Sequence, residues 1–158
     1  MAHGRSERNK KKIIEWLEEV SSDLDELSDV WLKFSIAVET DQTTDWYTFE
    51  RTISSTIPRY AFQGVIYSRL RRFYDSASVV LGDKVNSSFR DTFLDQLETV
   101  LYHRDVARAH VDQHLSRRVV LASSNQGSEI QKLRDATESL QKEAAALHVL
   151  ISNFKAMR

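Results

Sequence analysis

The chain has little of the material from which turns, disulfides and membrane spans are made. Its 158 residues include no cysteine, one proline and four glycines. The lack of cysteine excludes disulfides and thiolate metal sites. Because tight turns and hairpins consume glycine and proline, their scarcity argues against an all-β fold. The overall composition is typical of a globular protein, with 28% charged and 41% hydrophobic residues and a net charge of −1.

Long hydrophobic runs are also missing. No apolar run approaches the ~18 residues that cross a bilayer. The first apolar cluster, around Ile13 and Leu17, is interrupted by Glu15 and followed by Glu18 and Glu19, which a signal-peptide core would not carry. These features predict a cytoplasmic protein without a membrane partner. Residues 1–8 are polar and lack a pattern, so we expect a flexible tail before one domain over 9–158.

Two segments at the ends of the chain carry uninterrupted helical patterns. The first runs over about 9–38 and the last follows a loop at 123–127. In both, apolar side chains recur at alternating spacings of three and four, which is the heptad pattern of packed helices. The first stripe consists of Ile13, Leu17, Val20, Leu24, Leu27, Trp31, Phe34 and Val38, and the last of Ile130, Leu133, Thr137, Leu140, Ala144, Leu147, Ile151 and Phe154.

The middle of the chain predicts three further helices. A short one over about 45–57 ends at Pro58, which disfavours helix in the residue before it. A longer one over about 59–81 stops at Gly82, a residue suited to the left-handed conformation that ends helices. A third then runs over about 84–122, with Asp83 as its expected N-cap.

Together these patterns predict an all-α fold, an elongated antiparallel bundle of four long helices plus one short helix. Strict heptads fit left-handed packing near 20°. They can close the core of one chain or join two chains. The stripe that we expect to serve such an interaction consists of Leu133, Leu140, Leu147, Ile151 and Phe154.

One helical segment departs from a clean apolar stripe. On a helical wheel, Arg104 falls near the centre of the arc formed by Phe93, Leu97 and Val111, and Arg108 falls inside that arc. A buried arginine is costly unless it is paired, so one interpretation is an ion pair with another helix. The other is an anion site, because the planar guanidinium suits phosphate.

Histidines flank the two arginines. His110 and His114 are spaced i, i+4, yet no Glu-x-x-His motif recurs on a second helix, so we predict neither a metal nor a cofactor. Arg104, five intervening residues and His110 resemble the Arg-x(4–6)-His signature of HEPN-domain ribonucleases, with the polar Asp105 after the arginine. The resemblance implies metal-independent RNA cleavage with Arg104 and His110 as catalytic residues. Six residues apart on a regular helix, they lie roughly 9 Å apart along the axis, so a helix break or a second copy is needed.

Basic and acidic residues are unevenly spread along the chain. Acidic residues outnumber basic ones over 1–58, and basic ones outnumber acidic ones over 59–118, where Arg69, Arg71 and Arg72 precede two aromatic residues. The simpler explanation of this uneven charge is that the acidic N-terminal part packs against the basic middle of the chain. We therefore predict a non-enzymatic module that binds a protein partner or itself as a homo-oligomer. The alternative is an RNA-binding or RNA-cleaving bundle that uses Arg69, Arg71, Arg72, Arg104 and Arg108, with His110.

Overall fold

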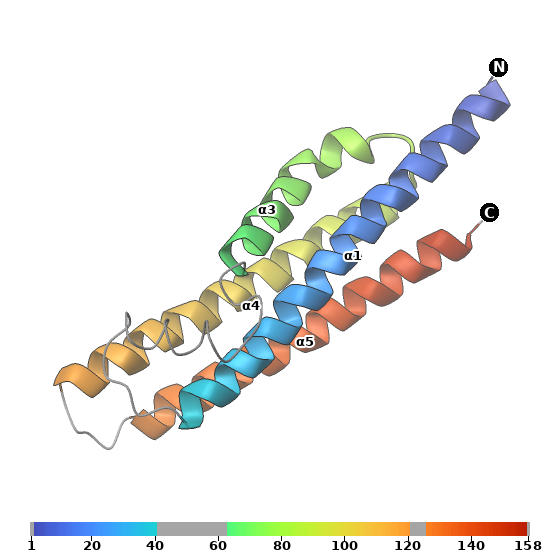
Figure 1. Ribbon diagram of the computed structural model, residues 1–158. Helices are drawn as coiled ribbons and strands as arrows, with labels where there is room; N and C mark the ends of the chain where they lie inside the picture. Colours follow the sequence, from blue (N-terminus) through green and yellow to red (C-terminus); the bar gives the residue numbers. More distant parts are fainter. Residues whose placement is uncertain (1, 41–62, 121–125, 158) are drawn as a thin grey trace.

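A computed structural model of the chain describes residues 2–40, 63–120 and 126–157, and these residues contain four α-helices and no strand (Figure 1). The helices are α1 (Ala2–Thr40), α3 (Gln63–Val80), α4 (Ser87–Val120) and α5 (Gln126–Ala156). The all-α prediction is confirmed for this part of the chain. In the same ranges, no helix is long and apolar enough to cross a membrane.

Each helix packs against two others, so that the four form a ring. The neighbouring pairs are α1 with α3, α3 with α4, α4 with α5, and α5 with α1. Figure 1 shows α1, α4 and α5 as long helices and α3 as a shorter one, with the two chain termini at the same end. Contacts between α1 and α5 show that these two helices run in opposite directions. Glu18 of α1 meets Lys155 of α5, and Asp25, further along α1, meets His148, which comes earlier in α5.

The helix bounds differ from the prediction in several places. The first helix begins at Ala2, so residues 2–8, expected to be a flexible tail, continue α1 in the structure. The predicted short helix over 45–57 lies outside the described residues. At the ends that the structure describes, α3 (Gln63–Val80) stops at Val80 instead of about 81, and α4 (Ser87–Val120) begins at Ser87 instead of about 84. The predicted helical residues 59–62 and 121–122 lie outside the described residues.

The connection between α3 and α4 follows the prediction in its first half only. Gly82 has a φ of 49°, which confirms the left-handed stop. The N-cap is Asn86, whose Oδ1 accepts a hydrogen bond of 2.7 Å from the Ser88 amide, so the prediction of Asp83 is wrong. The side chain of Arg90 in α4 donates to the Gly82 carbonyl at 2.9 Å and fixes the turn against the new helix.

The heptad stripes form the hydrophobic core. In α1 every predicted stripe residue from Ile13 to Phe34 is at most 3% exposed, and α5 contributes Leu133, Leu140, Leu147 and Ile151 at 2% or less. The other helices add buried side chains: Ile66, Leu70, Ala77, Phe93, Leu97, Val100, Leu101, Ala107 and Val111. Burial of this continuous core explains why the ring closes within one chain.

Aromatic rings connect all four helices near the end that carries the termini. Phe154 of α5 stacks on Phe89 of α4 at 4.5 Å between ring centroids, and Phe89 lies 6.0 Å from Phe93. Trp16 of α1 lies 5.6 Å from Phe93 and 5.6 Å from Phe73 of α3, in the latter case edge to face. This aromatic row therefore runs across the whole bundle and reaches the surface between α1 and α3.

We expect Leu147→Ala to lower the free energy of unfolding by about 2–5 kcal/mol, because it opens a cavity where the side chain is 0% exposed. Urea denaturation followed by far-UV circular dichroism measures the loss. The matched control is Val149→Ala two residues away, at 59% exposure, where a change within about 0.5 kcal/mol is expected. Equal losses in both variants would contradict the packing of α5 described above.

Candidate functional site

The guanidinium of Arg104 lies inside the bundle, as the helical wheel predicts. Its side chain is 13% exposed. The Cζ atom lies 3.9 Å from the ring centroid of Tyr67 in α3 and 5.7 Å from that of Trp31 in α1, so the cation sits against two aromatic faces. Burial lowers the pKa of Arg104, and Tyr67 and Asp105 partly offset this effect. The side chain thus joins three helices.

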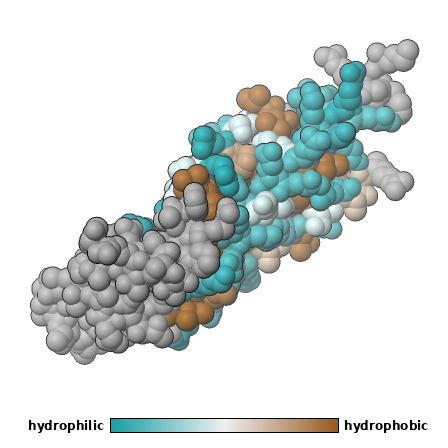
Figure 2. Space-filling model, in the orientation of Figure 1, coloured by the Kyte–Doolittle hydropathy of each residue, from teal (hydrophilic) through white to brown (hydrophobic). Residues whose placement is uncertain are grey.

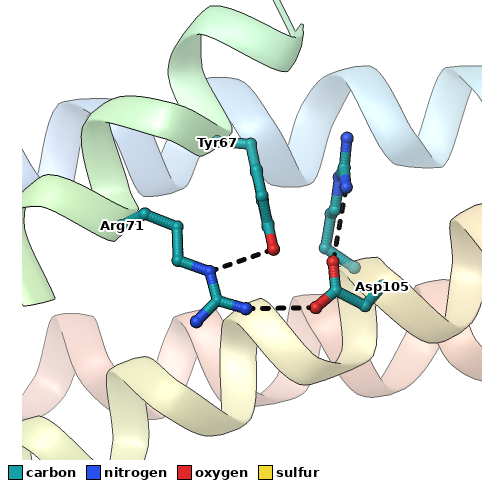
Figure 3. Close-up of polar contacts among 4 residues, drawn as sticks. Tyr67, Arg71 and Asp105 are labelled. Atoms are coloured by element: carbon teal, nitrogen blue, oxygen red, sulfur yellow. Dashed lines mark hydrogen bonds and ion pairs between the residues drawn. The ribbon is translucent and has the colours of Figure 1, made fainter.

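Asp105 links Arg104 to a second arginine on α3. Arg104 Nη1 lies 3.3 Å from one carboxylate oxygen of Asp105, and Arg71 Nη2 lies 3.3 Å from the other. Arg71 also donates from Nε to the Tyr67 hydroxyl at 3.0 Å, and this bond is the main reason for a raised pKa of Arg71 (Figure 3). Tyr67, Arg71, Arg104 and Asp105, named the arginine cluster below, form a closed set of contacts between α3 and α4.

Two further residues of the predicted RNA site lie further along α4. Arg108 and His110 are half-buried. The helix runs without interruption from Ser87 to Val120, so no break brings Arg104 and His110 together within one chain. The side chain of His114 lies outside the described residues. Among those that are described, no group of three or more histidine, cysteine or acidic side chains has the arrangement of a metal site.

Arg69 forms an ion pair that the sequence pattern did not reveal. Its Nε and Nη2 donate to the two carboxylate oxygens of Asp23 at 3.0 and 2.6 Å, which raises the pKa of Arg69. Asp23 is 5% exposed, so this carboxylate lies inside the bundle and not on the solvated face of α1. The sequence did contain a signal for the burial of Asp23, because the helical wheel of α1 places it beside Val20 and Leu27. The pairing of Asp23 with Arg69 could not be predicted, because it joins α1 to α3 and the spacing within one helix says nothing about partners on another.

A solvent-open groove of about 560 Å³ lies between α1 and α3, lined by Trp16, Arg69, Arg72, Phe73, Asp75 and Ser76. Trp16 and Phe73 form its apolar floor, and both are half-buried against the core. This floor is the exposed end of the aromatic row. A mostly apolar concavity with a few charged groups is the usual form of a binding site.

Three of the residues that line the groove, Arg69, Arg72 and Ser76, lie on the outer face of α3. Val65, Arg69, Arg72, Ser76 and Val79 recur at spacings of four and three, so they share one face, named the outer stripe of α3 below. Val65 is 49% exposed and Val79 is 78% exposed. On the face seen in Figure 2, hydrophobic patches are separated by hydrophilic side chains. The heptad spacing of this second stripe was visible in the sequence, but the valines were not singled out.

The charged residues that line the groove are of both signs, and all of them lie on α3: Arg69, Arg72 and Asp75. On α3, Arg72 is exposed and makes no hydrogen bond or ion pair with another described residue. On α1, Glu19 is exposed and likewise makes neither contact within the described ranges, although its charge contributes to the raised pKa of Arg69. Charges of both signs therefore lie on and beside the groove, without a division into a basic and an acidic edge.

The predicted interaction stripe of the last helix lies inside the bundle. Leu133, Leu140, Leu147 and Ile151 are buried, and Phe154 stacks on Phe89. In the folded chain these side chains already pack against neighbouring helices, so a partner would reach them only if the bundle opened. The groove and the outer stripe of α3, in contrast, are open to a partner of the folded chain.

Comparisons with protein-family models, curated proteins and solved structures found no match to this chain. The function is therefore inferred from the geometry of the molecule itself.

We expect Arg104→Ala to destabilise the fold by about 1–3 kcal/mol, because it removes the cation held against Tyr67 and Trp31. Arg104→Lys should restore only part of the loss, since an ammonium group lacks the planar stacking surface. Urea denaturation provides the measurement. Arg72→Ala, which removes an exposed arginine, is the control and should stay within about 0.5 kcal/mol of the wild type. A fully stable Arg104→Lys variant would refute the stacking argument.

Proposed function

We propose that this chain is a non-enzymatic helical module that acts through protein–protein contacts, as an oligomer or as a subunit of a larger assembly. The proposal includes an elongated antiparallel bundle with a short helix over 45–57, and a cytoplasmic location. The observation that carries it is the outer stripe of α3, where two exposed valines lie in line with an apolar groove.

A helix that only closes the core of a bundle needs one apolar face. α3 uses Ile66, Leu70 and Ala77 for that purpose. Val65 and Val79 lie on a different face, and their exposure keeps apolar surface in water without benefit to the isolated chain. Two exposed valines on a helix that lines a groove offer apolar contacts to a further helix. This surplus face supports a binding role.

The arginine cluster supports the same conclusion. Arg104 and Arg71 are engaged with Tyr67 and Asp105, in contacts that hold α3 against α4. An arginine fixed in this way contributes to the register of two helices. The arrangement therefore favours the structural interpretation of Arg104 over a catalytic one.

Two measurements test the proposed function together. Sedimentation equilibrium over a range of concentrations detects self-assembly of the 18.3 kDa chain, and display of a peptide library selects heterologous partners. We expect assembly, peptide selection or both, with at least one weakened by Val79→Asp on the outer stripe of α3. Val149→Asp on α5 is the matched control, because Val149 is also exposed and should tolerate the charge. A monomer that selects no peptide would overturn the proposal.

RNA binding is the second candidate, favoured by arginines that reach solvent on α3 and by Arg108 on α4. Arg71, with a side chain that is 45% exposed, and Arg72 both reach solvent on α3, while Arg108 lies on α4 near the cluster. Phosphate contacts of this kind need no base-specific geometry. Cleavage like that of HEPN-domain ribonucleases would require His110 of one copy to meet Arg104 of another, because α4 is continuous.

Titration of labelled single-stranded RNA at low and physiological salt tests this candidate. If it is correct, affinity falls steeply with salt, and Arg71→Ala and Arg72→Ala each make the logarithmic salt dependence shallower by roughly 0.7, the value for one RNA phosphate that is no longer neutralised. Lys142→Ala on the exposed face of α5 is the control for a general charge effect. Absence of binding at low salt would eliminate the RNA function.

A further inference from the structure

We infer that the surface of α3 that faces away from the bundle binds a second copy of this chain, with the two α3 helices antiparallel about a two-fold axis. This inference rests on the proposed function and names the partner. It is carried by a row of exposed residues whose charges and apolar side chains are placed so that the row is complementary to its own reversed copy.

The row consists of five residues that are all exposed and that recur at spacings of three, four, three and four. They are Val65, Ser68, Arg72, Asp75 and Val79, named the exposed row below. This is the heptad spacing of a helix that packs against another helix. On a helical wheel the exposed row lies opposite the buried face of α3, so it points away from the core of the bundle.

The exposed row is apolar at both ends and charged in the middle. Val65 and Val79 are 49% and 78% exposed. They lie roughly 21 Å apart along the helix, with Arg72 and Asp75 between them. Neither of these two charged side chains makes a hydrogen bond or an ion pair with another residue in the described ranges. One charge of each sign is therefore available to a partner.

Antiparallel pairing satisfies both charges with a second copy of the same row. In a two-fold interface, a contact from residue i to residue j is repeated from j to i. If the axis passes between Arg72 and Asp75, Arg72 of each copy meets Asp75 of the other, which gives two ion pairs. In the same register Val79 packs on the turn of the second copy that carries Val65 and Ser68, so the apolar ends are covered as well.

Other arrangements satisfy the exposed row less well. With parallel helices in register, Arg72 would meet Arg72 and Asp75 would meet Asp75, so like charges would face each other. A partner of a single charge sign would neutralise only one of the two residues. The charge pattern therefore favours the antiparallel copy. Because a pair of 18-residue helices gives a small interface, we expect a dimer that dissociates in the micromolar range.

Charge exchange across the proposed axis tests the inference. Arg72→Asp leaves two acidic residues in each row and Asp75→Arg leaves two basic ones, so we expect either change to weaken self-association roughly tenfold to a hundredfold. An equimolar mixture of the two variants should dimerise again, because each acidic row then faces a basic one. The double variant should dimerise alone, like the wild type. Sedimentation equilibrium of the full chain from about 1 to 500 μM measures the masses.

Two substitutions on α5 are matched controls, since they make the same changes of charge on exposed residues away from α3. Lys142→Asp and Glu138→Arg should each dimerise like the wild type. All the changed residues are exposed, so we expect every variant to keep the fold. Circular dichroism of each variant checks this.

Cross-linking tests the direction of the helices. Because the chain has no cysteine, Ser68→Cys and Val79→Cys each introduce a single thiol. Residues 68 and 79 come together between antiparallel copies, whereas the two copies of residue 68 lie roughly 16 Å apart along the axis. Air oxidation of the mixed variants should therefore give a disulfide between them, and little within either variant alone. Efficient cross-linking of Ser68→Cys alone would indicate parallel helices and overturn the inference.

Three results of the sedimentation experiments would also overturn the inference. Dimers that survive both single substitutions would place self-association on another surface. A mixture that fails to dimerise would exclude the reciprocal contact. A wild-type chain that stays monomeric but selects a library peptide through Val79 would make a different protein the occupant. In all three cases the proposed function survives, whereas a monomer that selects no peptide ends both.

Discussion

Arg104 places a positive charge where α1, α3 and α4 meet, and the surrounding residues have to accommodate it. A charge that is 13% exposed is tolerable only with partners that compensate for lost hydration. Tyr67 and Trp31 offer the negative faces of their rings, and Asp105 offers a carboxylate that it shares with Arg71. These contacts are directional, so they fix how α3 lies along α4. A core of leucines alone would not impose that register as strictly.

The register of α3 determines what remains on its outer side. With Tyr67 and Arg71 turned toward α4 and Arg69 bound to Asp23 of α1, the helix presents Val65, Arg72 and Val79 to solvent. The groove is a consequence of the same packing, since Phe73 meets Trp16 at the junction of the two helices. The structural arginine cluster and the candidate binding surface thus occupy different faces of α3, and substitutions can separate their effects.

Contacts at the other side of the ring hold α5 in place. His148 lies 2.7 Å from Asp25, and Lys155 lies 3.2 Å from Glu18, which aligns α5 with α1. Phe154 stacks on Phe89 and so aligns the same helix with α4. Exposed pairs of this kind add little stability individually. They act together with the buried heptad positions, which supply most of the free energy of folding.

The sequence by itself determined the helices, because a heptad pattern and a glycine stop depend on residues close together in the chain. It also determined that Arg104 would lie on the core face of its helix, because the angular position of a residue on a helix follows from its number in the chain. The tertiary structure alone decided which charges meet. The helical wheel places Asp23 between Val20 and Leu27, but only the approach of α3 gives it Arg69 as a partner. The groove likewise belongs to neither helix, since its two walls come from segments that are adjacent only after folding.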